Sequence, residues 1–267
     1  TIFAKRLVGN KYIGEVNEPA FSPDGKEIIF SQMLEATVDF RHKLYTMDTN
    51  GESTKLFLDA GAFSARCPSW SPDGKSIAFI VEDKLYKGLY VVDADNPDNP
   101  RKIIDAMPVL NQPSWSADSK MIAFAYEKIS TKYLSANVRM ERQIGGIYVV
   151  DVKTGQIRRH IPLARQPAWS PKEDLLVFER DYKYYLMNVN DFSESSEKYL
   201  LSNNPNPFGD RASRPITWSP DGKYIAFWRE IWPGLAGLYV AEVSKSGHLI
   251  MICADNRGIS SGMSWSQ

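Results

Sequence analysis

Five arginines come shortly before a repeated aromatic residue that is followed by serine, and their guanidinium groups are the clearest chemical signal in this chain. They are Arg66, Arg165, Arg211, Arg214 and Arg257, in segments such as SARCPSW and ARQPAW. A guanidinium group offers planar, paired N–H donors that suit a carboxylate or a phosphate. If equivalent loops open on one face, these arginines surround one opening and bind a carboxylate, a phosphate or an acidic peptide segment. The structural alternative is that each arginine stacks on a neighbouring tryptophan or pairs with a nearby aspartate.

A second set of candidate residues lies in three segments that we predict as loops, at 31–42, 125–145 and 228–237. Long loops in a compact domain are usually functional or mobile, and Tyr, Trp and Arg are the residues that anchor protein interfaces. We therefore predict contacts to a partner at Tyr126, Tyr133, Arg139, Trp228 and Trp232. The alternative is that these aromatic rings fold back onto their own sheets.

Signals for catalysis are weak. The histidines, His42, His160 and His248, stand at unrelated points and have no carboxylates or cysteines at metal-ligand spacing. No G-x-S-x-G nucleophile turn and no glycine-rich nucleotide-binding motif occurs. The oxygen-rich stretch at 93–99, DADNPDN, favours a solvated turn over a calcium loop. We expect no catalytic residue, no metal and no cofactor.

The composition limits the class of partner. The chain has 267 residues with 32 basic and 32 acidic side chains, so its formal net charge is zero. This balance argues against a nucleic-acid partner, and no apolar run has the length of about 20 residues that a membrane-inserted helix needs. The two cysteines, Cys67 and Cys253, are too few for a disulfide framework. A protein or peptide partner remains the expectation.

The elements that carry these residues follow from an internal repeat. An aromatic residue before serine recurs every 45 to 54 residues, at Phe21, Trp70, Trp115, Trp169, Trp218 and Trp265. Between these positions lie β-branched and aromatic runs such as GLYVVD and GIYVVD, each followed by turn formers. In the second repeat we predict strands at 69–70, 77–81, 89–93 and 101–104, with the SPDG sequence forming the first hairpin turn. Four short strands per repeat and no helical pattern predict the blades of a β-propeller.

The sequences WSPDGKxIAF and LYVVDxxxG resemble the WD40-like PD40 repeat of TolB-type propellers, and they are similar to repeats in the propeller domains of prolyl-oligopeptidase-like peptidases. The resemblance covers nearly the whole chain, with repeats that start near 19, 68, 113, 167, 215 and 263. The third and fourth repeats depart from it, with SADSK at 116–120 and SPKED at 170–174. Because both lack the glycine, we expect their hairpins to turn differently. In the region before the inner strand, the first repeat has Glu18 and the third has Gln112 in place of arginine.

We therefore predict one all-β domain over residues 1–267, a six-bladed propeller of four-stranded antiparallel blades. The last repeat begins at 263–267 and stops, and residues 1–16 contain two short strand-like halves that could complete it. A blade built from both termini would leave no free sheet edge. The alternative is a truncated larger propeller.

The function that we favour is a non-catalytic scaffold that binds a protein or peptide, and the resemblance to TolB-type propellers implies an exported protein, periplasmic or secreted. We expect that exchanging Arg165 and Arg214 for glutamate would abolish binding without lowering the melting temperature. The first alternative is a gating or substrate-filtering propeller of a prolyl-oligopeptidase-like hydrolase whose catalytic domain is absent from this chain. The second is a propeller lyase or lactonase, which would need clusters of His, Asp or Glu near the channel axis.

Overall fold

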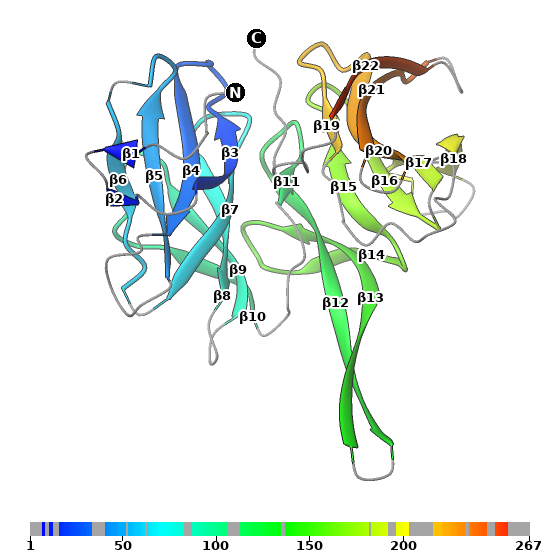
Figure 1. Cartoon of the computed structure of the whole chain (residues 1–267), viewed down its shortest axis with the longest axis horizontal. Helices are drawn as coiled ribbons and strands as arrows, with labels where there is room; N and C mark the ends of the chain where they lie inside the picture. Colours follow the sequence, from blue (N-terminus) through cyan, green and yellow to red (C-terminus); the bar gives the residue numbers. More distant parts are fainter. Residues whose placement is uncertain are drawn as a thin grey trace. The chain divides into compact units, whose positions relative to one another are not determined.

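The computed structural model describes most of the chain and divides it into two compact units (Figure 1). The described residues are 7–8, 11–12, 16–33, 41–51, 53–61, 63–82, 87–105, 113–134, 137–181, 183–191, 196–202, 216–232, 235–244 and 249–255. Unit 1 comprises Thr1–Ala106 with Ile259–Gln267, and unit 2 comprises Met107–Gly258. Each unit is built from four-stranded antiparallel sheets whose strands follow the order of the chain.

Unit 1 contains the first two blades and a short hairpin. Blade 1 consists of β3 (Val16–Phe21), β4 (Glu27–Met33), β5 (His42–Asp48) and β6 (Lys55–Leu58). Blade 2 consists of β7 (Ser64–Trp70), β8 (Ser76–Glu82), β9 (Lys87–Asp93) and β10 (Arg101–Asp105). The hairpin pairs β1 (Leu7–Val8) with β2 (Lys11–Tyr12).

Unit 2 contains three further blades. Blade 3 consists of β11 (Ser114–Trp115), β12 (Met121–Leu134), β13 (Asn137–Asp151) and β14 (Ile157–Pro162). Blade 4 consists of β15 (Arg165–Trp169), β16 (Leu175–Arg180), β17 (Lys183–Asn188) and β18 (Glu197–Ser202). Blade 5 consists of β19 (Ile216–Trp218), β20 (Tyr224–Trp232), β21 (Leu235–Glu242) and β22 (Leu249–Asp255).

The predicted architecture, an all-β propeller of four-stranded antiparallel blades, is confirmed, but the number of complete blades differs. The described residues form five such blades rather than six. The inner strand expected at 263–267 lies outside the described residues, and so does most of the segment 1–16, of which β1 and β2 form a separate two-stranded sheet.

The inner strand of the second repeat is longer than its sequence predicts. The other three predicted strands lie within β8, β9 and β10, but the prediction at 69–70 covers only the end of β7, which begins at Ser64. The strand continues through Pro68 because the pairing register shifts between Arg66 and Ser69, which leaves the proline in a β-bulge. A bulge is one of the few places in a sheet that tolerate proline.

The SPDG turns are built alike, and one expected exception turns in the same way. Gly25 takes φ +69° and its N–H donates to the carbonyl of Ser22 at 2.9 Å. In the third repeat Ser119 occupies the glycine position with φ +60° and donates to the carbonyl of Ser116 at 2.9 Å, so the prediction of a different turn was wrong there. The shared Ser-x-Asp side-chain bonds hold the turn closed even where the left-handed residue is not glycine.

The fourth repeat does turn differently, as expected. It has no aspartate at the third turn position, and the Ser170 hydroxyl instead accepts hydrogen bonds from the backbone N–H groups of Lys172 and Glu173, both at 3.3 Å. The hairpin still closes, because the N–H of Ser170 donates to the carbonyl of Leu175 at 2.8 Å.

Every blade carries a phenylalanine on its second strand directly opposite a tyrosine on its third strand. The pairs are Phe30 with Tyr45, Phe79 with Tyr90, Phe124 with Tyr148, Phe178 with Tyr185, and Phe227 with Tyr239. Four of the pairs are stacked with centroids 5.7 to 6.1 Å apart, while the rings of Phe124 and Tyr148 are tilted by 54°. Cross-strand aromatic pairs of this kind stabilise a sheet and set its register.

Apolar side chains between consecutive blades form the core of each unit. In unit 1, Leu44 of blade 1 packs with Phe79 of blade 2. In unit 2, Trp169 of blade 4 packs against blade 3, and Leu200 of blade 4 packs with Trp218 of blade 5. The indole N–H of Trp218 also donates to the carbonyl of Ala168 at 2.8 Å, which joins the inner strands of blades 4 and 5.

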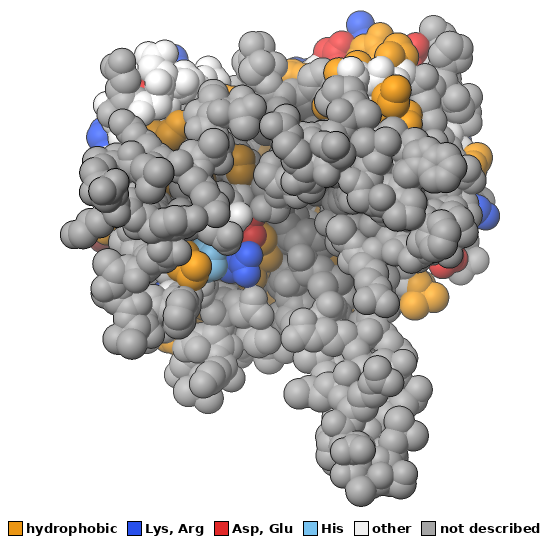
Figure 2. Space-filling view, in the orientation of Figure 1, with side chains coloured by type: hydrophobic (Ala, Val, Ile, Leu, Met, Phe, Trp, Pro, Cys, Tyr) orange, Lys and Arg blue, Asp and Glu red, His pale blue; other side chains and the backbone are white. Residues whose placement is uncertain are grey.

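The outermost strand of blade 5 differs from its counterparts. In four blades the outer strand has a β-bulge next to the residue that pairs with the tyrosine of the third strand. The bulge residues of blades 1, 2, 4 and 5 are Phe57, Ile103, Leu200 and Ile252. Ile103 and Leu200 are 8% and 3% exposed, whereas Ile252 is 58% exposed. Hydrophobic side chains are visible on this surface at the upper right of Figure 2, where β22 lies. The side of blade 5 that carries Ile252 is therefore uncovered among the described residues.

The aspartates in the hairpin turns make the stability of the fold depend on pH in the acid range. Hydrogen bonds from the Ser22 hydroxyl and the Lys26 N–H lower the pKa of Asp24 below 3.8, and equivalent bonds from Ser219 and Lys223 lower the pKa of Asp221. A carboxyl group whose pKa is depressed by folding stabilises the folded state above its ordinary pKa and loses that effect as the pH falls through the folded value.

We therefore expect the melting temperature to fall as the pH drops below 3.8. The double variant Asp24→Asn with Asp221→Asn keeps an acceptor oxygen in each turn but has no charge to neutralise. Its loss of melting temperature between about pH 6 and about pH 2.5 should be smaller than that of the parent chain, measured by circular dichroism. An equal loss in both proteins would show that the turn carboxylates do not contribute.

Candidate functional site

Three inner strands share a strained backbone position directly before a proline. Glu18, Cys67 and Gln166 have φ angles of +59°, +52° and +57°, and the pairing register of β3, β7 and β15 shifts at these residues. A left-handed conformation costs a residue with a side chain roughly 1–2 kcal/mol, so it persists only where the surroundings hold it. The bulge places the preceding residue, which is Arg66 in β7 and Arg165 in β15, beside a buried carboxylate.

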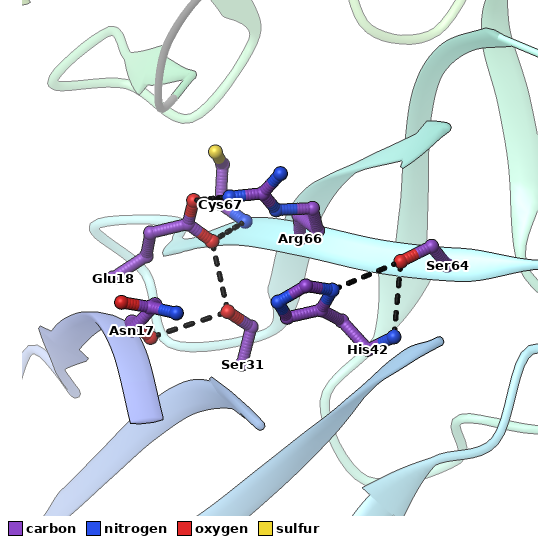
Figure 3. Close-up of polar contacts among 7 residues, drawn as sticks. All are labelled: Asn17, Glu18, Ser31, His42, Ser64, Arg66 and Cys67. Carbon is purple, nitrogen blue, oxygen red and sulfur yellow. Dashed lines mark hydrogen bonds and ion pairs between the residues drawn. The ribbon is translucent and has the colours of Figure 1, made fainter. Parts of the chain in front are cut away.

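The first of these carboxylates is Glu18, which joins blade 1 to blade 2 (Figure 3). It accepts hydrogen bonds from the Ser31 hydroxyl at 2.9 Å and from the backbone N–H of Cys67 at 2.6 Å. Its other oxygen lies 3.2 Å from Nη2 of Arg66. Only 11% of the Glu18 side chain is exposed, so the cation and the two further donors are what make its burial tolerable.

Arg66 keeps part of its guanidinium group accessible. Its side chain is 38% exposed while it pairs with Glu18, and its buried Nε atom has no hydrogen-bond partner among the described residues. On the neighbouring strands, the backbone N–H of His42 donates to the Ser64 hydroxyl at 3.0 Å, and the imidazole Nδ1 lies 3.2 Å from the same hydroxyl (Figure 3). The exposed part of the Arg66 guanidinium group can donate a hydrogen bond to one further anionic oxygen.

Arg165 is held more tightly in an equivalent position. Its Nη2 lies 2.6 Å from Oε1 of Glu179, which is its register partner on β16. The two side chains are only 15% and 6% exposed. This is the structural alternative that the sequence left open, with glutamate rather than aspartate as the partner.

The remaining predicted arginines, Arg211, Arg214 and Arg257, lie outside the described residues, as does Gln112. A shared opening lined by all five arginines therefore stays a prediction. Cys67 is half-buried and forms no disulfide bond, and its backbone N–H donates to Glu18.

The segment predicted as a loop at 125–145 is a long β-hairpin. β12 and β13 have 14 and 15 residues and pair continuously from Met121 opposite Asp151 to Leu134 opposite Asn137. This hairpin extends well beyond the rest of its sheet (Figure 1). We call its projecting part, residues 127–144, the arm. The loop prediction was wrong because the two strands pair with each other beyond the sheet, from Tyr126 to Leu134 and from Asn137 to Gly146, which satisfies the backbone donors and acceptors that face the partner strand.

Three aromatic rings stand at the base of the arm. Tyr126 stacks on Tyr148 with centroids 4.5 Å apart and an interplanar angle of 7°, and its hydroxyl lies 3.1 Å from Nε2 of His160. His160 in turn lies against Tyr148, with centroids 4.9 Å apart. Burial and the adjacent Tyr148 hydroxyl raise the pKa of Tyr126 to about 12, so this phenol stays protonated over the physiological range.

Two glycines make this cluster possible. A Cβ atom on Gly145 would lie 2.2 Å from Cε2 of Tyr126, and one on Gly146 would lie 2.4 Å from the carbonyl oxygen of Ile161. Gly146 also has φ +142°, next to the register shift between Tyr126 and Glu127. The ring cluster and the bulge therefore set where the arm leaves blade 3.

The other predicted contact residues lie in strands. Tyr133 belongs to β12 and Arg139 to β13, within the arm, and Trp228 and Trp232 belong to β20. Their side chains lie outside the described residues. The segment 228–237 was predicted as a loop, but β20 and β21 pair through most of it, up to Trp232 opposite Leu235. In the segment 31–42, β4 continues to Met33 and β5 begins at His42, while 34–40 lies outside the described residues.

The sequence did not reveal that Glu18 is the partner of Arg66 or that His160 closes the aromatic cluster. Glu18 stands where the second, third and fourth repeats have Cys67, Gln112 and Gln166, and an acidic residue at this position was the available signal. No group of three or more His, Cys, Asp or Glu side chains within the described ranges could hold a metal ion. No helix in the described part of the chain is long and apolar enough to cross a membrane.

The chain is similar in sequence to a curated protein that is named as a peptidase. It is 25% identical over 191 residues to the uncharacterized peptidase YuxL of Bacillus subtilis, a match that covers 69% of this chain and 24% of that protein. No protein-family model matches the chain.

Solved structures show the same fold. TolB from Acinetobacter baumannii has a TM-score of 0.62 and 22% identity, over 86% of this chain and 53% of TolB. The acylaminoacyl peptidase of Pyrococcus horikoshii has a TM-score of 0.58 and 17% identity, over 89% of this chain and 39% of the peptidase. The oligogalacturonate lyase of Vibrio parahaemolyticus has a TM-score of 0.55 and 16% identity, over 86% of this chain and 65% of the lyase. The chain is thus a β-propeller of the kind found in TolB and in peptidase propeller domains. It spans about half the length of TolB and about a quarter of the length of the curated peptidase.

The burial of Arg165 changes what its replacement should do. Arg165→Glu would place two carboxylates side by side in a buried position, and Arg165→Met would leave Glu179 without its cation. Breaking a buried ion pair by removing one partner costs about 3–5 kcal/mol. We expect either variant to lower the free energy of unfolding by this amount in urea denaturation.

A double variant separates the ion pair from simple packing. Arg165→Met with Glu179→Met replaces both charges by apolar groups and should recover most of the lost stability. If the double variant were as unstable as Arg165→Met alone, the loss of the ion pair between Arg165 and Glu179 would not be the cause.

Proposed function

We propose that this chain is a non-catalytic propeller of the TolB-like kind that binds a protein or peptide through loops and strands that depart from its repeat. The observation that supports this most is the arm of blade 3. The second and third strands of blade 4 have 6 residues each, whereas β12 and β13 have 14 and 15. On a repeated scaffold, binding residues occur where one repeat differs from the others.

The charges of the arm suit an acidic partner. Within 127–144 the basic residues are Lys128, Lys132, Arg139 and Arg142, and the acidic ones are Glu127 and Glu141. Lys132 and Arg139 are direct register partners on the two strands. Like charges directly opposite each other destabilise a β-ribbon, and a carboxylate bound between them would remove this repulsion. The proposed partner therefore carries a carboxylate or an acidic segment, as proposed for the exposed part of Arg66.

The arm also has a structural reason to bind. An isolated two-stranded ribbon is marginally stable in water, and in the described part of the chain no third strand pairs with β12 or β13 beyond Gly146. The rings of Tyr126, Tyr148 and His160 pack together at the base of the arm. A partner would therefore bind an element that is anchored where it leaves blade 3.

Peptide selection tests this proposal. A phage-displayed peptide library selected against the intact chain should be enriched in acidic peptides. Replacing 128–143 by Asn-Gly, a two-residue hairpin turn between Glu127 and Ile144, should reduce their binding by about tenfold or more. Lys132→Glu is the sharper variant, because it should weaken acidic peptides while leaving the melting temperature unchanged or higher.

The control is Lys128→Glu, which changes the arm's charge equally but lies opposite Gln143 rather than a base. It should not raise the melting temperature. If acidic peptides bound the shortened variant as well as the intact chain, the arm would not be the binding element.

The second candidate is a propeller domain of a prolyl-oligopeptidase-like hydrolase that filters substrates. It is favoured by the match to a peptidase of which this chain covers 24%. The intact mass of the native protein decides between the candidates. A native mass larger than 30.2 kDa by roughly 25–30 kDa, one further domain of about 250 residues, would favour the hydrolase. By its resemblance to TolB-type propellers, we propose that the protein is exported, and the same native sample would show this by cell fractionation.

We further propose that the uncovered side of blade 5 is closed by a sixth blade to which both ends of the chain contribute. The exposure of Ile252 supports this, because Leu200 and Ile103, which occupy the same bulge position in blades 4 and 2, are buried. Two residues before the bulge, blades 1, 2 and 4 carry Lys55, Arg101 and Lys198, whereas blade 5 carries Ile250. An apolar residue in place of these charges fits a surface that is covered.

Three alanine variants test the sixth blade. Leu200→Ala removes a buried side chain and should cost about 2–5 kcal/mol in the free energy of unfolding. Ile252→Ala should cost a similar amount if a further blade covers it. Met251→Ala, at the register position where blades 1 and 4 carry the exposed Leu56 and Tyr199, should cost less than about 1 kcal/mol. A result for Ile252→Ala no larger than for Met251→Ala would contradict closure. Dependence of the loss on protein concentration would assign the cover to a second copy instead.

A further inference from the structure

Unit 1 contains a pocket that has no part in the proposed function. It lies between the outer strand of blade 1 and the face of blade 2, has a volume of about 500 Å³, and is roofed by the turn between β9 and β10. This volume is in the range of small-molecule sites in proteins. Its base is formed by Phe79 and Val81, which are 0% and 4% exposed, so its depth is apolar.

The pocket is not a general consequence of the repeat. Phe57 of blade 1 and Leu200 of blade 4 occupy the same bulge position on their outer strands. Leu200 is 3% exposed and packed with blade 5, whereas Phe57 is only half-buried and lines the pocket. The junction of blades 1 and 2 is therefore open at a place where the junction of blades 4 and 5 is filled.

Aromatic rings form much of the wall. Phe57, Phe63 and Tyr90 are all half-buried, and Tyr90 stacks on the buried Phe79 with centroids 5.8 Å apart. Half-buried rings at a concave surface offer both contact area and the negative potential of their faces, which attracts cations.

The charges of the lining have one sign. Two carboxylates, Asp59 and Asp98, line the pocket, and the described lining contains no Lys, Arg or His. Asp59 is already compensated, because its Oδ2 lies 2.5 Å from Nζ of Lys43 and its Oδ1 accepts the N–H of Gly61 at 3.0 Å. Asp98 is exposed and makes no hydrogen bond or ion pair with another residue in the described ranges. The uncompensated charge at the rim is thus negative.

From these observations we propose that the pocket between blades 1 and 2 binds an organic monocation with an apolar body, such as an ammonium group attached to an aromatic or branched aliphatic group. The apolar body contacts Phe57, Phe63 and Tyr90, and the ammonium group pairs with Asp98 at the rim. A free amine and the amino terminus of a peptide share this chemistry. No lining residue of the pocket belongs to the arm, so the test of this site is separate from the test of the proposed function.

Three probes that share a phenethyl group and differ in charge test the selection for charge. Phenethylammonium, the neutral phenethyl alcohol and the anionic 3-phenylpropionate are titrated into the full chain at low ionic strength by isothermal calorimetry. We expect phenethylammonium to bind with a dissociation constant near 1 mM, about what its size allows, and at least about threefold more tightly than the alcohol. The anion should bind least. Equal binding of cation and anion, or no saturable binding of the cation, would overturn the proposal.

Three variants locate the site. Asp98→Asn removes the rim charge without changing shape and should reduce the affinity for phenethylammonium to that for the alcohol. Ala60→Trp, at the half-buried edge of the lining, should block all three probes. Asp95→Asn, an exposed carboxylate of the same turn outside the lining, is the matched control and should leave the affinity within about twofold. If Asp98→Asn and Ala60→Trp changed nothing, the probe would bind elsewhere and the assignment would be wrong.

Two further probes distinguish the sources of the cation. Phe-Ala-amide presents its amino terminus next to an aromatic side chain, and its N-acetylated form lacks the charge. Tighter binding of Phe-Ala-amide than of phenethylammonium would support a peptide amino terminus as the ligand, and the reverse order would support a free amine. Binding of the acetylated peptide as tight as that of Phe-Ala-amide would contradict recognition of a cation.

Discussion

The structure depends on one constraint, which is that a blade with apolar side chains on both faces must be covered on both. The cross-strand pairs of phenylalanine and tyrosine, the buried second strands and the inner-strand tryptophans all serve this purpose. Within unit 1, blade 1 packs on blade 2, and within unit 2 blade 4 packs on both blades 3 and 5. A repeated sheet of this kind is stable only as part of a series, since each blade supplies half of every interface. The uncovered Ile252 on blade 5 is an exception to this rule among the described residues.

The inner strands carry a second recurring constraint, the left-handed residue before proline. It bends the strand and brings a basic side chain beside a buried carboxylate, as in Arg66 with Glu18 and Arg165 with Glu179. The two pairs differ in consequence because their burial differs. Arg165 is enclosed and stabilises its own blade, whereas Arg66 links two blades and keeps an exposed part that a ligand could reach. The same residue type at the same repeat position therefore has two physical roles.

The places where blades depart from the repeat are the places where binding is proposed. Blade 3 has an arm that begins at a bulge where Gly145 and Gly146 leave room for neighbouring atoms, and none of the described residues forms a third strand beside it. The junction of blades 1 and 2 keeps an aromatic pocket lined by Asp98, which has no ionic partner among the described residues, whereas the junction of blades 4 and 5 is filled by Leu200. The partner proposed for the arm is acidic and the ligand proposed for the pocket is cationic, so the two proposed sites would select for opposite charge.

The sequence by itself determined the repeat, the four-stranded blades and the hairpin turns, because strand periodicity and turn chemistry are local properties. It predicted Tyr126 and the arginines as candidates but not their partners. Glu18 is separated from Arg66 by 48 residues, and Tyr126 from His160 by 34, so these contacts exist only after strands from distant segments pair and pack. Sequence also failed at Ser119, where side-chain hydrogen bonds hold a left-handed turn without glycine, and at 125–145, where strand pairing extends through a segment that looked like a loop. Burial decided the rest, because whether an arginine is a ligand site or half of a buried ion pair depends on which side chains surround it in the folded chain.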